Sequence, residues 1–314
     1  MSVRWARWSV ACLLVGSPLS AQRNSDLDRA DALLAAGRLI AAENIYYSAA
    51  RQRPRDPATR RALGRYLAAR GALRIGAVLL EEARYFGGDK QGIALDLAPV
   101  YAALGDYRAL AALPAGLLTT PERRRAEYLA ANAPAVTLND SAVVPLIPPT
   151  RDGIGDISIV IDLDTLIATI DPATTGLVLD TAWARRRSSR LFGSAVDSRR
   201  ASGVVSEVGI GSAVLRKVPA RYTPMPAGRA RIGPDILAAL MPTIDEKRRQ
   251  VILRAPRARI RNSGDKLLTL TTRATILVTS PDSAVAIDSP MGRALLAGRR
   301  WTWIARAGVI WVER

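Results

Sequence analysis

The sequence of 314 residues contains no histidine and a single cysteine, Cys12. Without histidine, Ser-His-Asp catalysis and histidine-based zinc sites are excluded, and one cysteine cannot form a disulfide within the chain. The chemistry that remains depends on carboxylates, hydroxyl groups, lysine, or binding without catalysis. We therefore expect no metal and no cofactor.

Lysine is also scarce, so the formal net charge of +17 comes almost entirely from arginine. A basic chain attracts anionic partners, and nucleic acid is the most specific of these. The arginines are scattered, however, and no groove of interleaved aromatic residues is evident. We do not expect nucleic acid as a partner, and we interpret the charge as attraction to acidic partners or to an anionic envelope surface.

Long apolar runs are absent after the N-terminus, so no membrane span is expected there. Residues 1–21 have the pattern of a secretory signal: Arg4 and Arg7 precede a short apolar core, and small residues follow at 18–21. The apolar core is too short for a membrane-anchor helix. We predict export to the periplasm or beyond, which would leave a mature chain without cysteine.

Residues 22–132 are predicted to be helical, because apolar residues recur at three- and four-residue spacing. Gly37, Gly71 and Gly105 are 34 residues apart, and each lies between two apolar helical stretches. A tight turn between paired helices favours glycine, which tolerates positive φ. This spacing is similar to that of the tetratricopeptide repeat (TPR). The resemblance implies a solenoid that recruits peptide or protein ligands, and a generic helical bundle is the alternative.

The pattern changes after residues 133–151, a proline-rich stretch that we interpret as a linker or as extended chain against the next domain. From residue 157 the apolar period becomes two and β-branched residues dominate. We predict hairpins at 157–170, 204–222 and 243–254, a strand at 176–180, helices at 181–192 and 236–240, and a loop at 224–229.

One stretch stands out in this β-rich region: residues 167–184, IATIDPATTGLVLDTAWA. An apolar strand leads into Asp171, a turn of small residues follows, and a second apolar strand comes next. Two adjacent carboxylates that share a proton can activate a water molecule against a peptide carbonyl. Such a site needs each acid on a hydrogen-bonded turn and a hairpin that excludes bulk water.

The order of elements over residues 156–254 resembles the retropepsin-like aspartyl protease domain. A hairpin precedes the apolar step into Asp171, the hydroxyl residues Thr174 and Thr175 follow, and a later hairpin turns at Gly211 and Ser212. The resemblance implies a mainly-β barrel over residues 152–256. It also implies Asp171 as the catalytic candidate, Thr174 and Thr175 as supporting residues, and Gly211 and Ser212 at a flap or cleft.

The sequence departs from the family's pattern immediately after Asp171. The family has Thr or Ser and then Gly, whereas this chain has Pro172 and Ala173. Proline has no hydroxyl and no N–H, and alanine costs about 1 kcal/mol if φ is positive at that position. Thr174 or Thr175 could supply a replacement hydroxyl. The alternative is that Asp171 only caps a turn in a domain that does not catalyse.

A single lobe supplies one aspartate, so a second must come from a homodimer or from another lobe. Residues 257–314 are a candidate for a truncated second lobe, in which Ser280 and Pro281 fall opposite Asp171 and Pro172, with Asp282 nearby. The alternative is extra strands that complete a sheet. Tryptophans on both sides of Gly308 predict a final hairpin with a core-facing aromatic side.

The predicted fold class is α+β and multidomain: signal 1–21, TPR solenoid 22–132, linker 133–151, retropepsin-like barrel 152–256 and β extension 257–314. The first functional hypothesis is an exported aspartyl endopeptidase that recruits substrates through its TPR surface. The second is an inactive pseudoprotease that binds peptides or proteins as a scaffold in the cell envelope. A binder of anionic surfaces or nucleic acid is the third hypothesis.

Overall fold

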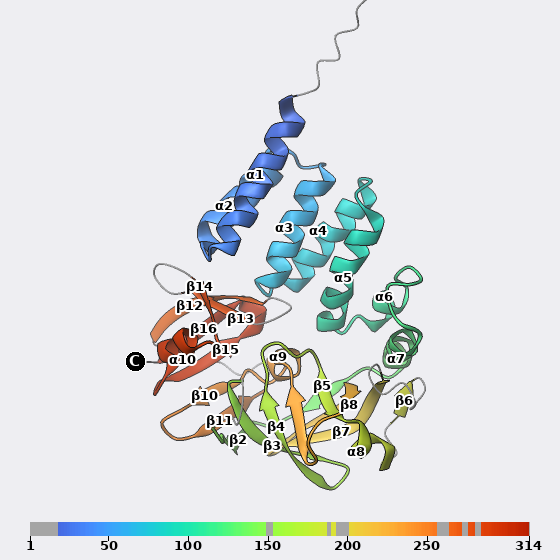
Figure 1. Cartoon of the computed structure of the whole chain (residues 1–314), viewed down its shortest axis with the longest axis vertical. Coiled ribbons are helices and arrows are strands. Elements are labelled where there is room, and N and C mark those ends of the chain that lie inside the picture. Colours follow the sequence, from blue (N-terminus) through green and yellow to red (C-terminus); the bar gives the residue numbers. More distant parts are fainter. Residues whose placement is uncertain are drawn as a thin grey trace, which may run out of the picture.

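The computed structural model describes residues 18–148, 153–186, 190–192, 201–255, 264–271, 276–279 and 284–313. Figure 1 shows helices at one end of the molecule and two β-sheets at the other. Most of the expected signal, residues 1–17, lies outside the described residues, and the first helix begins at Pro18. No helix in the described ranges is long and apolar enough to cross a membrane.

The N-terminal region is helical, as the periodicity predicted. Its helices are α1 (Pro18–Ala35), α2 (Leu39–Gln52), α3 (Pro57–Ala69), α4 (Leu73–Tyr85), α5 (Lys90–Leu104), α6 (Tyr107–Ala111) and α7 (Thr120–Ala131). Gly37, Gly71 and Gly105 lie between paired helices with φ of +75°, +85° and +72°. The predicted glycine turns are therefore confirmed, while the TPR resemblance stays a prediction.

The first sheet closes into a six-stranded barrel. Its strands run in the order β8, β5, β9, β4, β3, β7, and β7 pairs again with β8. The bounds are β3 (Gly155–Ile161), β4 (Asp164–Ile170), β5 (Leu177–Asp180), β7 (Ala201–Ile210), β8 (Ala213–Thr223) and β9 (Arg229–Ile232), with β1 (Ala135–Thr137) and β6 (Arg190–Phe192) added at the edges. The pairs β4–β9 and β5–β8 are parallel.

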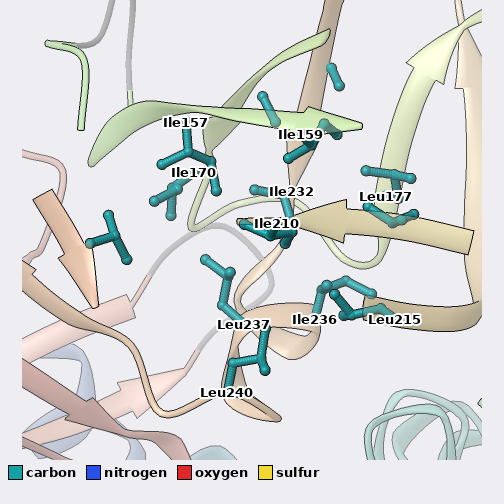
Figure 2. Packing of buried hydrophobic residues seen from close by; sticks show 14 of the residues in the cluster. Ile157, Ile159, Ile170, Leu177, Ile210, Leu215, Ile232, Ile236, Leu237 and Leu240 are labelled. Atoms are coloured by element: carbon teal, nitrogen blue, oxygen red, sulfur yellow. The ribbon is translucent and has the colours of Figure 1, made fainter. Parts of the chain in front are cut away.

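The inward-facing residues of these strands are β-branched and aliphatic, so alternation along each strand produces the barrel core. Figure 2 shows Ile157, Ile170, Leu177 and Ile232 packed together, with Leu237 of α9 (Pro234–Ala238) beside them. All five side chains are buried. The short helix α8 (Thr181–Arg186) follows β5.

The second sheet is antiparallel and draws on three parts of the chain. Its strands lie in the order β14, β13, β12, β16, β15, β10, β11, β2. The bounds are β2 (Ser141–Pro145), β10 (Thr243–Asp245), β11 (Gln250–Arg254), β12 (Gly264–Thr271), β13 (Ile276–Thr279), β14 (Ala284–Ala286), β15 (Arg300–Ile304) and β16 (Val309–Glu313), with α10 (Pro290–Leu296) between β14 and β15. The predicted final hairpin is confirmed, and Trp301 and Trp303 are buried.

One secondary-structure prediction is wrong in part, and one strand was not predicted. The helix predicted at 181–192 ends at Arg186, and Arg190–Phe192 form β6 because they pair with β7. The loop predicted at 224–229 is confirmed up to residue 228, and strand β9, which begins at Arg229 and lies between β4 and β5, was not predicted. In both places, pairing with another strand decides the structure, and the local pattern does not show it.

Two arginine side chains of the helical region donate hydrogen bonds to backbone carbonyls of the two sheets. Arg125 of α7 donates from Nη1 to Ala220 O of β8 at 3.0 Å. Arg70, at the end of α3, donates to Gly308 O at 2.9 Å and to Thr269 O. These bonds join the helices to the barrel and to the second sheet.

Candidate functional site

Asp171 lies where β4 leaves the barrel. The neighbouring parallel strand β9 holds this point, because Asp171 N donates to Ile232 O at 3.1 Å. The Asp171 side chain is 16% exposed, so the carboxylate is largely covered but still reached by solvent. The sequence predicted that Asp171 follows an apolar strand and begins a turn, and the structure shows this arrangement.

The turn after Asp171 holds both carboxylate oxygens. Ala173 N donates to Oδ1 at 2.9 Å, and Thr174 Oγ1 donates to Oδ2 at 2.8 Å. Ala173 is not among the described residues with positive φ, so its Cβ introduces no backbone strain of that kind. The Ala173 amide and the Thr174 hydroxyl therefore both donate to the carboxylate, and position 173 accommodates alanine.

The charged neighbour of Asp171 is a guanidinium group. Arg231 of β9 places Nη1 3.6 Å from Asp171 Oδ2, and its side chain is 53% exposed. Within the described residues, the side-chain partners of Asp171 are Ala173 N, Thr174 Oγ1 and Arg231, and no group of three or more acidic residues could hold a metal ion. Ser280, Pro281 and Asp282, the counterparts expected from a second lobe, lie outside the described residues.

The other three predicted site residues lie elsewhere. Thr175 is exposed, and its carbonyl accepts from Arg221 Nη2 at 3.0 Å. Gly211 and Ser212 form the tip of the β7–β8 hairpin, where Ser212 Oγ donates to Ser141 O at 3.4 Å. A Cβ on Gly211 would lie 3.1 Å from Val144, so the tip packs on β2. The structure brings Thr174 to Asp171, and the contacts that it gives Thr175, Gly211 and Ser212 are with other residues.

Asp235 supports the same turn, and the sequence indicated only a helix start for it. Both of its oxygens accept from Gly176 N at 2.9 Å, across 59 positions of sequence. Burial raises the pKa of the Asp235 carboxyl, and the N–H donors and Arg221 oppose that rise without cancelling it. Burial, and then the nearby Asp235, raise the pKa of Tyr107 on α6 to about 12.

A buried ion pair fixes the strands that carry Asp171. The Asp156 side chain is 1% exposed and accepts from Arg229 Nη2 at 2.9 Å and from Thr169 Oγ1 at 2.7 Å. These three residues belong to β3, β9 and β4, the strands next to the turn. The alternation of apolar and polar residues did not predict this pair, because an aspartate within a strand is usually expected to face solvent.

No protein-family model and no curated protein match this chain. Among solved structures, the chain is similar to a retropepsin-like aspartic protease from Rickettsia conorii, with 12% sequence identity and a TM-score of 0.28. That similarity covers 39% of this chain and 93% of the other. At this TM-score the similarity carries no argument about fold or activity, so the functional assignment depends on the geometry around Asp171.

Proposed function

We propose that the barrel is a pseudoprotease, which binds an extended peptide or protein segment at the Asp171 turn without cleaving it. The observation that carries this proposal is Arg231, whose guanidinium lies 3.6 Å from Asp171 Oδ2. The helical pairs, with their 34-residue spacing, add a surface for partner recruitment. Export through residues 1–21 places this scaffold in the cell envelope.

The chemical argument concerns what stands beside the acid. Hydrolysis by paired carboxylates requires one proton shared between two acids. A guanidinium stays protonated in proteins and accepts no proton, so Arg231 cannot take the role of the second acid. Its N–H groups can instead donate to the carbonyls of a bound peptide, since half of the side chain is open to solvent.

Peptide hydrolysis by a homodimer is the second candidate function. The favourable observation is the intact support of the carboxylate by Ala173 N and Thr174 Oγ1. In this arrangement each chain supplies one Asp171, and the two turns meet at the dimer axis. Arg231 would then have to move away from Oδ2 for the carboxylates to approach each other.

A combined binding and cleavage assay separates the two candidates. The mature chain is incubated with a random-sequence peptide library at pH 4 and pH 7, and mass spectrometry identifies retained and cleaved peptides. We expect the wild type to retain peptides and cleave none, and Arg231→Gln to weaken retention several-fold. An exposed ion pair contributes about 0–1 kcal/mol, so this substitution should leave the fold intact.

Arg248→Gln is the matched control, because Arg248 is also exposed and pairs with an aspartate, Asp245, on another part of the surface. It should bind peptides as the wild type does. Cleavage by the wild type that disappears in Asp171→Asn would establish hydrolysis and reject the pseudoprotease. Retention of no peptide by any variant would reject peptide binding.

A further inference from the structure

A pocket of about 470 Å³ lies between α7 and the barrel, next to the Asp171 turn. Its walls come from α7, β5, β7 and β8, and include Thr119, Glu122, Val178, Ser202, Arg221 and Thr223. The pocket adjoins the turn because Arg221 Nη2 donates to Thr175 O at 3.0 Å. A ligand that lies along the turn can therefore place one side chain in this pocket.

The pocket offers hydrogen-bond donors that the described chain leaves free. Arg221 is exposed, and its bond to Thr175 O uses one of its five N–H groups. Ser202 is 1% exposed, and its hydroxyl has no hydrogen-bond partner among the described residues. A buried hydroxyl without a partner costs free energy, and the Ser202 oxygen is closed to solvent, so its side chain must turn toward a ligand in the pocket to recover that cost.

Glu122, the acidic residue in the pocket wall, already accepts two hydrogen bonds. Glu122 Oε2 accepts from Thr119 N at 2.9 Å and from Thr119 Oγ1 at 2.8 Å. This capping box begins α7, where the helix dipole also favours a negative charge. Arg125, one turn further along α7, lies close enough to Arg221 for their charges to repel. Glu122 keeps its negative charge and attracts Arg125, so the positive charge that the pocket itself offers to a ligand is that of Arg221.

We propose that this pocket binds an acidic side chain, Asp or Glu, of the peptide held at the Asp171 turn. Arg221 binds the carboxylate through paired N–H groups, as guanidinium groups do with carboxylates, and Ser202 adds a hydroxyl bond. Val178 and the aliphatic wall contact the stem of the side chain. This inference depends on the proposed peptide binding, and it defines the class of peptide selected.

The test compares two pools of random-sequence peptides, one with Glu and one with Gln fixed at a single position, on the full mature chain. We expect the Glu pool to be retained at least about tenfold better, the scale of a charge-assisted hydrogen bond. Arg221→Gln should remove this preference. Arg216→Gln, an exposed arginine on the same strand that pairs with Glu207, should keep it.

Ser202→Ala provides a second variant that does not disturb folding, because it removes a hydroxyl without a partner. It should weaken retention of the Glu pool more than that of the Gln pool. Equal retention of both pools by the wild type overturns the acidic pocket and leaves peptide binding intact. Retention of neither pool overturns peptide binding itself. Binding of free succinate or glutamate through Arg221, with no peptide retained, rejects a peptide ligand in favour of a small carboxylate.

Discussion

At the scale of single residues, the site is defined by which charges meet. Asp171 lies beside a guanidinium, Asp156 is buried against Arg229, and Asp235 is half-buried and accepts from a backbone N–H. These three aspartates therefore have different chemical surroundings, although all lie within one barrel. Asp171 combines a carboxylate that its own turn supports with an exposed arginine beside it, and this distinguishes it as the candidate site.

Burial of Asp235 predicts a pH dependence of stability. The pKa of Asp235 is raised in the folded chain. Its contribution to folding stability is therefore fully present below the pKa of the unfolded chain, and it is lost as the pH rises through the pKa of the folded chain. Asparagine keeps one acceptor for Gly176 N and does not titrate. The melting temperature of Asp235→Asn, relative to wild type, should therefore rise between pH 4 and pH 8. A constant difference across that range would contradict the assignment.

At the scale of elements, α7 is the helix that connects the candidate site to the helical region. Its start carries a complete capping box between Thr119 and Glu122, which also lines the proposed pocket. Its middle carries Arg125, bonded to β8. Order at the start of α7 therefore sets the shape of the pocket wall.

Loss of this cap should loosen the first turn of α7. Thr119→Ala removes the hydroxyl that accepts from Glu122 N and donates to Glu122 Oε2, at a cost of about 1 kcal/mol. Backbone amides in the first turn should exchange hydrogen about fivefold faster, as measured by mass spectrometry. Thr120→Ala is the matched control, since Thr120 is exposed inside the helix, and it should leave exchange unchanged. Equal effects of both substitutions would show that the cap does not hold the helix.

The sequence predicts the elements that local patterns determine, and it misses those made by distant pairing. Helical periodicity and glycine spacing predict the paired helices, and alternation predicts the β3–β4 and β7–β8 hairpins. Strands β6 and β9 have only three and four residues, and their partners lie elsewhere in the chain. A strand this short shows no clear apolar period, so the sequence alone assigned β6 to a helix and predicted no strand at β9.

The same distinction between local and non-local contacts applies to the candidate site. Asp171 and Thr174 are three positions apart, so the sequence could suggest that they meet in one turn. Arg231 reaches Asp171 only because β9 lies parallel to β4, and that pairing could not be derived from either segment alone. The ion pair that carries the proposed function was for this reason absent from the sequence-based prediction.

At the scale of the whole molecule, segments distant in sequence share one sheet. Strand β2, from the proline-rich stretch, pairs with β11, and β10 pairs with β15 of the C-terminal region. The helical region then rests on this sheet at two glycines. A Cβ on Gly71 would overlap Ala305 O, and a Cβ on Gly308 would overlap Arg70 O. Both contacts require glycine for reasons of space as well as of backbone conformation.

Substitution of two glycines of similar conformation tests the contact between Gly308 and Arg70. Gly308 and Gly298 have φ of +59° and +64°, and nothing lies within 4 Å of a Cβ placed on Gly298. Alanine at either position costs about 1–2 kcal/mol for the left-handed backbone. Gly308→Ala should cost more, because it also pushes Arg70 away from Gly308 O and Thr269 O. Thermal unfolding and limited proteolysis measure the difference, with faster cleavage between helices and sheet expected for Gly308→Ala alone. Equal destabilisation by the two substitutions would mean that the helical region does not depend on this contact with the second sheet.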